Sequence, residues 1–169
     1  MLFVCIGNVC RSPFGERLLA ARLPGERFEV SSAGVGAMVG HAMSRYAAAE
    51  LRSRGGDPTG FAARQLTPDL LEHADLVLTA TRELRSRVLA EMPAALRRTF
   101  TVLEFAALAE HAEGSTPAEL VRWAAVHRST AAGTEQDVPD PYRRGAEEHA
   151  RAARMLDAAV QQIAKGLDR

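Results

Sequence analysis

The first residues of the chain place a short apolar segment, a glycine-bearing loop and a helix start in direct succession, and this order constrains the fold most strongly. Residues 2–5 are continuously apolar, as in strands that are buried on both faces of a parallel sheet. Pro13 favours a helix over residues 12–23, because proline in the first helical turn removes no hydrogen bond. Pro24 and Gly25 end this helix. A strand that leads through a short loop into a helix is typical of α/β domains.

The same alternation of apolar runs and helical segments continues along the chain. Further strands are expected within residues 28–31, 75–80 and 99–103. The later helices are expected to begin at or near Ser44, Thr67, Thr81, Glu104, Pro117 and Ala146. Strands separated by helices form right-handed crossovers, so the sequence predicts an α/β fold with a parallel sheet. In such sheets the functional site lies beyond the carboxyl ends of the strands, where the loop after residue 5 is expected.

Length and composition favour one globular domain. A chain of 169 residues has the usual size of a single domain, so residues 1–169 are expected to form one unit. The 21 basic and 21 acidic residues cancel, which argues against a surface for nucleic acid or a membrane. The 2 cysteines are too few for a disulfide framework, and no apolar segment suits a signal peptide or a membrane span. These features predict a cytoplasmic protein without membrane insertion.

The loop after the first strand carries the groups that bind a phosphate. Successive backbone N–H groups in front of a helix form a cradle for an anion, and Gly7 permits the positive φ angles that a tight cradle needs. Asn8 adopts left-handed geometry readily or ties the loop together through its side chain. Arg11 supplies a planar fork for two phosphate oxygens. The residues predicted to bind phosphate are Ile6, Gly7, Asn8, Val9, Cys10, Arg11 and Ser12.

Cys5 and Asp140 have the properties of a nucleophile and a proton donor. The N–H groups, the helix N-terminus and Arg11 all favour the thiolate form of Cys5, and Ser12 is placed to donate a hydrogen bond to the sulfur. A phenolate leaving group needs a general acid, and Asp140 lies in a stiff segment between two prolines. The same carboxylate then serves as base for the water that hydrolyses phosphocysteine. The 5 histidines are scattered, so no metal site is predicted.

Two separated segments resemble one known family. Residues 4–13 resemble the signature loop of the low-molecular-weight protein tyrosine phosphatases, and residues 140–142 resemble their general-acid loop. Further similar segments are residues 32–34, 63–65 and 74–78. The resemblance implies a three-layer domain with a four-stranded parallel sheet flanked by helices. It also implies phosphotyrosine proteins as substrates, Cys5 as nucleophile, Arg11 as phosphate clamp, Asp140 as proton donor and no cofactor.

A finer resemblance concerns the substrate pocket and its partner. Residues 36–40 and 139–143 are similar to the bacterial subgroup that serves exopolysaccharide-linked tyrosine kinases. In that subgroup an aliphatic residue replaces an aromatic wall of the pocket, and Met38 has this position here. Tyr142 is the remaining aromatic wall, and Arg143 replaces the second aromatic residue of the family. The resemblance therefore implies a wider pocket and a tyrosine kinase as a substrate, although Met38 is equally consistent with plain loop packing.

The chain departs from the family pattern at two segments. The family often has histidine where this chain has Phe61, and that histidine supports the loop asparagine. We therefore expect weaker support for Asn8 and altered loop rigidity. Residues 79–81 lack the Met-Asp pair that is common in relatives. Neither departure touches the three predicted catalytic residues.

Two other functions remain as alternatives to a phosphatase, and the roles of several side chains are open. A thiol-dependent arsenate reductase on the same scaffold needs further cysteines or an external thiol, and no cysteine follows Cys10. A non-catalytic phosphotyrosine-binding module would lack the nucleophile or the acid, and both are present. Cys10 is either a reversible disulfide partner of Cys5 or a small apolar loop residue. We interpret Asp137 as a loop-capping acid and Trp123 as a packing residue. A solvent-exposed helix face is expected for Arg82, Arg85 and Arg87, and the alternative for them is a docking patch for a phosphorylated tyrosine-rich tail.

Overall fold

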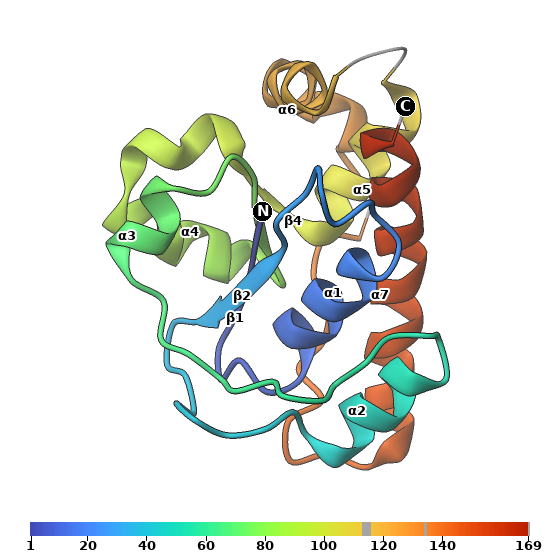
Figure 1. Cartoon of the computed structure of the whole chain (residues 1–169). Coiled ribbons are helices and arrows are strands. Elements are labelled where there is room, and N and C mark those ends of the chain that lie inside the picture. Colours follow the sequence, from blue (N-terminus) through green and yellow to red (C-terminus); the bar gives the residue numbers. More distant parts are fainter. Residues whose placement is uncertain (113–115, 134, 169) are drawn as a thin grey trace.

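The described part of the chain folds around one parallel sheet. A computed structural model describes residues 1–112, 116–133 and 135–168. The strands in these residues are β1 (Leu2–Cys5), β2 (Ser31–Gly34), β3 (Val77–Thr79) and β4 (Thr99–Thr101). They are all parallel and lie in the order β2-β1-β3-β4, with β1 in the interior of the sheet (Figure 1). This arrangement confirms the predicted α/β fold with four parallel strands flanked by helices.

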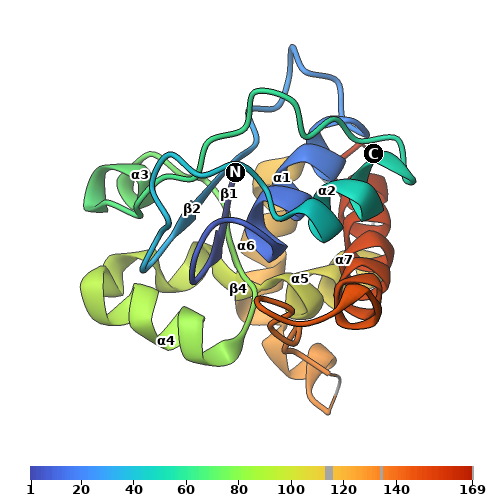
Figure 2. The same ribbon diagram turned by 90° about the horizontal axis from the view of Figure 1, so that it is seen from below.

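Helices cover both faces of the sheet. Their bounds are α1 (Arg11–Ala20), α2 (Arg45–Arg52), α3 (Pro68–Glu72), α4 (Arg82–Glu91), α5 (Val102–His111), α6 (Pro117–Val126) and α7 (Ala146–Leu167). Figures 1 and 2 show α3 and α4 on one face, and α1, α5 and the long α7 on the other. Two short 3-10 helices, Pro93–Arg98 and Arg128–Ala131, were not predicted from the sequence.

The alternation of side chains along each strand divides the core into two parts. Phe3, Leu78 and Phe100 belong to the core on the side of α1, α5 and α7. Leu2 and Val77 belong to the smaller core beneath α3 and α4. Successive strand residues point to opposite faces, so a strand with helices on both sides is apolar at every position. This explains the uninterrupted apolar run with which the chain begins.

Two strands differ from their predicted positions. β2 covers Ser31–Gly34 instead of residues 28–31, because the apolar Phe28 is only partly buried beside the core and does not pair with β1. The β2 residues that pair with β1 are small, and a small residue is required at the end of β2. A Cβ atom on Gly34 would lie 2.3 Å from the carbonyl oxygen of Ile6. β4 ends at Thr101 instead of residue 103, since Thr101 already begins α5 as the N-cap of a capping box.

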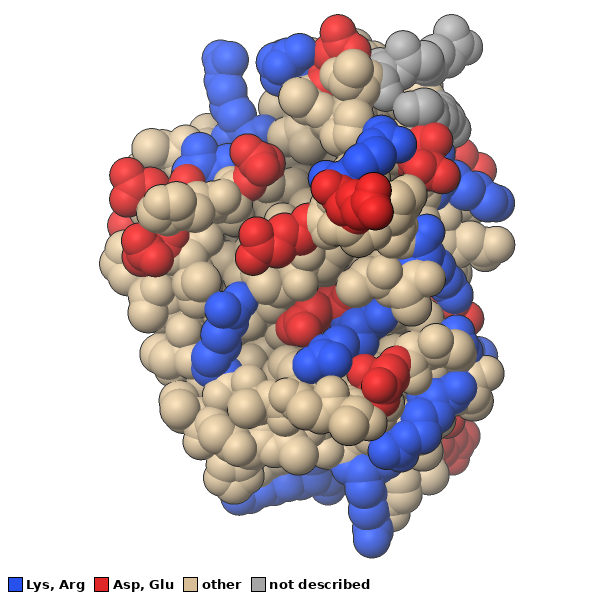
Figure 3. All heavy atoms as spheres, in the orientation of Figure 1, with Lys and Arg blue, Asp and Glu red and all other residues tan. Residues whose placement is uncertain are grey.

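Basic and acidic side chains are interspersed on the surface. Basic and acidic side chains alternate over the face drawn in Figure 3, in keeping with equal numbers of 21 Lys and Arg and 21 Asp and Glu residues in the sequence. No helix in the described residues is long and apolar enough to cross a membrane.

Candidate active site

The loop between β1 and α1 wraps around the sulfur of Cys5. Cys5 is the last residue of β1, and its side chain is buried. The backbone N–H of Asn8 donates to the Cys5 sulfur at 3.3 Å, and the Ser12 hydroxyl oxygen lies 2.9 Å from that sulfur. α1 begins at Arg11, one residue earlier than expected, so the helix N-terminus opens onto the loop. This geometry brings amide and hydroxyl groups to the sulfur, where they favour an anion.

Asn8 holds the loop in its strained shape. Its φ of 53° is in the left-handed region, which asparagine tolerates better than most residues. Its side-chain amide donates to the hydroxyls of Ser12 at 2.9 Å and Ser32 at 2.8 Å, and its oxygen accepts from the backbone N–H of Arg64 at 2.8 Å. Both N–H groups and the carbonyl of this buried amide therefore have partners.

The expected weakening of Asn8 support beside Phe61 is not observed. Ser32 and Arg64 supply the partners of Asn8, while Phe61 is buried in the core with the guanidinium of Arg17 5.7 Å from its ring. The sequence indicated segments 32–34 and 63–65 only through their resemblance to the family. The structure shows what these segments do. β2 and the segment after α2 lie beside the loop, and Ser32 and Arg64 from them hydrogen-bond to Asn8.

Glu16 is a further member of this network that the sequence analysis missed. The Ser32 hydroxyl donates to the Glu16 carboxylate at 2.5 Å, and Arg17 pairs with the same carboxylate at 3.1 Å. Burial raises the pKa of Glu16, and the bonds from Ser32 and Arg17 oppose that rise. The sequence shows an acid one helical turn after Ser12. Its contact with Ser32 could be predicted only from the correct position of β2, and the strand had been predicted at residues 28–31.

Arg11 lies between the phosphate loop and the segment that carries the proposed acid. Its guanidinium is buried, with Nη1 donating to the carbonyl of Val138 at 3.0 Å and Nη2 2.8 Å from Oδ2 of Asp140. The Nε–H group has no hydrogen-bond partner among the described residues. A buried guanidinium N–H without an acceptor is costly, so this group is ready to bind an oxyanion.

The acid-loop segment, residues 135–142, is fixed to the carboxyl edge of the sheet. The N–H of Val138 donates to the carbonyl of Ala80 at 2.9 Å, just after β3. Oδ1 of Asp140 accepts from the N–H of Tyr142 at 3.2 Å, which orients the carboxyl group. The fold thus brings Asp140 to Arg11, as the sequence predicted, across 129 positions of the chain.

A pocket of about 170 Å³ opens at this point. Its walls are formed by Cys5, Ile6, Gly7, Val9, Cys10, Arg11, Gly36, Met38, Asp140 and Tyr142. The predicted nucleophile, clamp and acid therefore meet in one pocket with both predicted wall residues. Asn8 and Ser12 do not line the pocket and act from behind the loop.

Cys10 is a buried residue in the pocket wall. Burial raises the pKa of the Cys10 thiol to about 12, so the group is protonated at neutral pH. Its sulfur lies 3.7 Å from Nε2 of His149, and neither Cys5 nor Cys10 forms a disulfide. Within the described ranges, no group of three or more His, Cys, Asp or Glu residues has the arrangement of a metal site.

Comparisons with known proteins agree with this geometry. The family model for low molecular weight phosphotyrosine protein phosphatase matches residues 1–120. The chain is 32% identical over 169 residues to the low molecular weight protein-tyrosine-phosphatase Etp of Escherichia coli K12, covering 100% of this chain and 95% of Etp. Among solved structures, the Erwinia amylovora tyrosine phosphatase AmsI matches with a TM-score of 0.77 and 27% identity, over 99% of this chain and 92% of that one. The YwlE arginine phosphatase of Geobacillus stearothermophilus matches with a TM-score of 0.73 and 26% identity, over 99% and 91%. The chain belongs to the low molecular weight protein-tyrosine-phosphatase family.

Proposed function

We propose that this chain hydrolyses phosphotyrosine in proteins through a phosphocysteine intermediate. Cys5 is the nucleophile, Arg11 is the phosphate clamp, and Asp140 is first the general acid and then the general base. The observation that carries this proposal is the meeting of a buried cysteine, a buried arginine and a carboxyl group at one pocket of about 170 Å³. Residues 6–12 supply the remaining phosphate-binding groups through the loop.

The first step transfers the phosphoryl group to sulfur. The phosphate dianion enters the loop and competes with Asp140 for the guanidinium of Arg11, whose Nε–H is already without a partner. The Cys5 thiolate forms the S–P bond while the bond between phosphorus and the tyrosine oxygen breaks. Asp140, displaced from Arg11 by the phosphate, takes up a proton from water and gives it to that oxygen, so tyrosine leaves as a neutral phenol.

The second step releases phosphate. Asp140, now a carboxylate, removes a proton from water as the water oxygen attacks phosphorus. The S–P bond breaks and Cys5 leaves as a thiolate, which the Ser12 hydroxyl at 2.9 Å and the Asn8 N–H at 3.3 Å stabilise. When phosphate leaves, Asp140 releases this proton to water and pairs with Arg11 again, which returns the enzyme to its starting state.

The pocket walls favour an aromatic substrate. Val9, Met38 and Tyr142 give the wall apolar surface against which a phenyl ring packs. A phosphoarginine side chain would bring a guanidinium that needs acceptors. The pocket has one carboxylate, Asp140, and Arg11 already holds it. Phosphotyrosine therefore suits this pocket better than phosphoarginine. The resemblance of residues 36–40 and 139–143 to the kinase-associated subgroup supports a bacterial tyrosine kinase as the protein substrate.

A comparison of phosphorylated peptides tests this function. Purified protein in the presence of a chelator is given one peptide sequence carrying phosphotyrosine, phosphoserine or phosphoarginine, and released phosphate is measured. We expect turnover of the phosphotyrosine peptide, inhibition by vanadate, and no turnover by Cys5→Ser although this variant still binds phosphate. Preference for phosphoarginine, a metal requirement or activity of Cys5→Ser would each contradict the proposal.

A further inference from the structure

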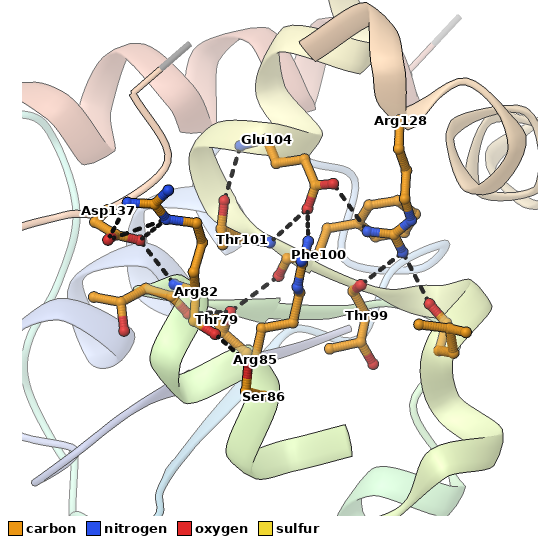
Figure 4. A network of polar contacts seen from close by, with 12 residues as sticks. Thr79, Arg82, Arg85, Ser86, Thr99, Phe100, Thr101, Glu104, Arg128 and Asp137 are labelled. Carbon is orange, nitrogen blue, oxygen red and sulfur yellow. Dashed lines mark hydrogen bonds and ion pairs between the residues drawn. The ribbon is translucent and has the colours of Figure 1, made fainter. Parts of the chain in front are cut away.

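Asp137 joins the acid loop to the first turn of α4. Its Oδ1 accepts from the backbone N–H of Arg82 at 2.7 Å, and its Oδ2 lies 3.1 Å from Nη2 of the Arg82 guanidinium (Figure 4). Asp137 thus caps the N-terminus of α4 and forms an ion pair with its first residue. The capping role predicted for Asp137 and the solvent-exposed position predicted for Arg82 are both confirmed, whereas the ion pair between them was not predicted.

The helix that receives Asp137 is itself firmly anchored. Arg85 of α4 pairs with the buried carboxylate of Glu104 at 2.8 Å, and Arg128 pairs with the other oxygen of Glu104 at 2.9 Å. Glu104 also accepts from the N–H of Thr101 in the capping box of α5. Figure 4 shows these contacts running from Asp137 through α4 to Arg128. Arg82 is therefore a fixed point for the acid loop.

Little torsional freedom separates Asp137 from the proposed acid. Only Val138 and Pro139 lie between Asp137 and Asp140, and Pro141 follows. The proline rings fix φ, and Val138 is held by hydrogen bonds on both its N–H and its carbonyl. The segment from Asp137 to Asp140 is consequently one stiff unit, whose orientation depends on its anchors at Arg82, Ala80 and Arg11 together.

We propose that Asp137 and Arg82 are positioning residues that aim Asp140 at the leaving oxygen, an inference that rests on the proposed role of Asp140 as general acid. Neither residue touches the substrate in this account. Asp137 lines a second cleft of about 490 Å³, which shares Ile6, Arg11 and Asp140 with the smaller catalytic pocket. Its effect on the reaction passes through the backbone of the acid loop.

The charge states of Asp137 and Arg82 fit a positioning role better than they fit a role of Asp137 as a second proton donor. Burial raises the pKa of Asp137, but the bonds and charge of Arg82 outweigh this effect and lower it below its usual value. Asp137 in turn raises the pKa of Arg82. Both groups are charged throughout the neutral range, so the ion pair persists during turnover and Asp137 has no proton to give.

A series of aryl phosphates tests the inference, because only poor leaving groups need the proton of Asp140. In Asp137→Asn we expect kcat/KM for phenyl phosphate to fall about five- to tenfold, and kcat/KM for p-nitrophenyl phosphate to change less than about twofold. Arg82→Ala is expected to show a smaller effect of the same kind, since Asp137 still accepts from the backbone N–H of residue 82. Thermal unfolding of each variant reports whether the fold is retained.

Two further variants separate the outcomes. Arg87→Ala changes an arginine of the same helix and the same cleft that has no ion pair in the described part of the chain, and we expect wild-type values for both substrates. Asp140→Ala gives the full loss for phenyl phosphate. If Asp140→Ala is selective for phenyl phosphate but Asp137→Asn and Arg82→Ala affect both substrates equally or neither, the positioning role is wrong. If Asp140→Ala itself slows both substrates equally, the assigned general acid is wrong.

Discussion

Nη2 of Arg11 and Oδ2 of Asp140 lie 2.8 Å apart, so the proposed phosphate clamp and the proposed acid form an ion pair. The carboxyl group is about two fifths exposed, whereas Arg11 is almost completely buried. An incoming phosphate therefore exchanges one anionic partner of Arg11 for another, and the released carboxyl group is then free to carry the proton for the leaving oxygen. The ion pair links substrate binding to preparation of the acid.

Asp140→Asn is expected to bind inorganic phosphate more tightly although it catalyses more slowly. Its amide no longer competes for Arg11 or repels the dianion, and a partly exposed ion pair is worth up to about 1 kcal/mol, or about fivefold in Kd. Titration calorimetry of Asp140→Asn and wild type with phosphate measures the difference. Equal or weaker binding by Asp140→Asn would show that the pair does not oppose phosphate.

Gly34→Ala is expected to damage the phosphate loop from the neighbouring strand. The new Cβ would lie 2.3 Å from the Ile6 carbonyl oxygen and 3.0 Å from the Asn8 nitrogen, and both are backbone atoms that cannot rotate away. We expect a loss of about 1–3 kcal/mol in unfolding free energy and a marked fall in kcat/KM. Urea unfolding and p-nitrophenyl phosphate assays measure the two effects.

Gly25→Ala is the matched control for Gly34→Ala. Gly25 has open space around its Cβ position and lacks a positive φ angle, so alanine fits there without strain. Its stability and activity should stay at wild-type values. A similar loss in both variants would mean that the contact with the loop is not the cause.

Glu104→Gln is expected to destabilise the fold more than the same change at Glu119. Both residues occupy the third position of a capping box, but Glu104 is buried between Arg85 and Arg128, whereas Glu119 is exposed. Removal of the buried charge leaves two arginines without their partner and should cost about 2–4 kcal/mol. Chemical denaturation of both variants measures the difference, and equal losses would show that the capping box alone matters.

The contribution of Glu16 to the free energy of unfolding should change with pH. Burial raises its folded-state pKa above the ordinary value of a glutamate, so the native state binds more protons than the unfolded state between the unfolded and the folded pKa. Stability due to this group is therefore lost as the pH rises through that interval. Glu16→Gln should gain unfolding free energy relative to wild type as the pH rises above the ordinary pKa of a glutamate, which urea unfolding at a series of pH values measures.

Glu119→Gln should show the opposite trend, which makes it a control for the sign. Hydrogen bonds from Thr116 lower the pKa of Glu119, so its contribution is present above the unfolded pKa and is lost as the pH falls. Its variant should lose unfolding free energy relative to wild type as the pH rises. Parallel pH curves for the Glu16 and Glu119 variants would contradict the assigned environments.

Residues near one another in the chain could be assigned from the sequence. Cys5, Asn8, Arg11 and Ser12 belong to one loop, so their spacing and residue types alone indicated a phosphate cradle. Asp140 was assigned because its prolines mark a stiff segment. The structure places all of these side chains around or behind the predicted pocket.

Contacts between distant segments could not be assigned in the same way. The pair of Arg82 and Asp137 joins residues 55 positions apart, and its existence depends on how α4 meets the acid loop. The hydrogen bond between Asn8 and Ser32 was not predicted. The apolar Phe28 suggested a strand that begins three residues before β2 and does not include Ser32. Small polar residues pair with β1 there because the backbone of the loop lies too close for larger ones.

Trapping of the phosphoenzyme tests the central claim most directly. Asp140→Asn is mixed with p-nitrophenyl phosphate, quenched rapidly, digested and examined by mass spectrometry. A good leaving group needs no acid, whereas the second step lacks its base, so a phosphoryl group should accumulate on the peptide that contains Cys5. The Cys5→Ser variant treated in the same way should release no p-nitrophenol. Hydrolysis without a phosphoryl group on Cys5, or with one on another residue, would contradict the account.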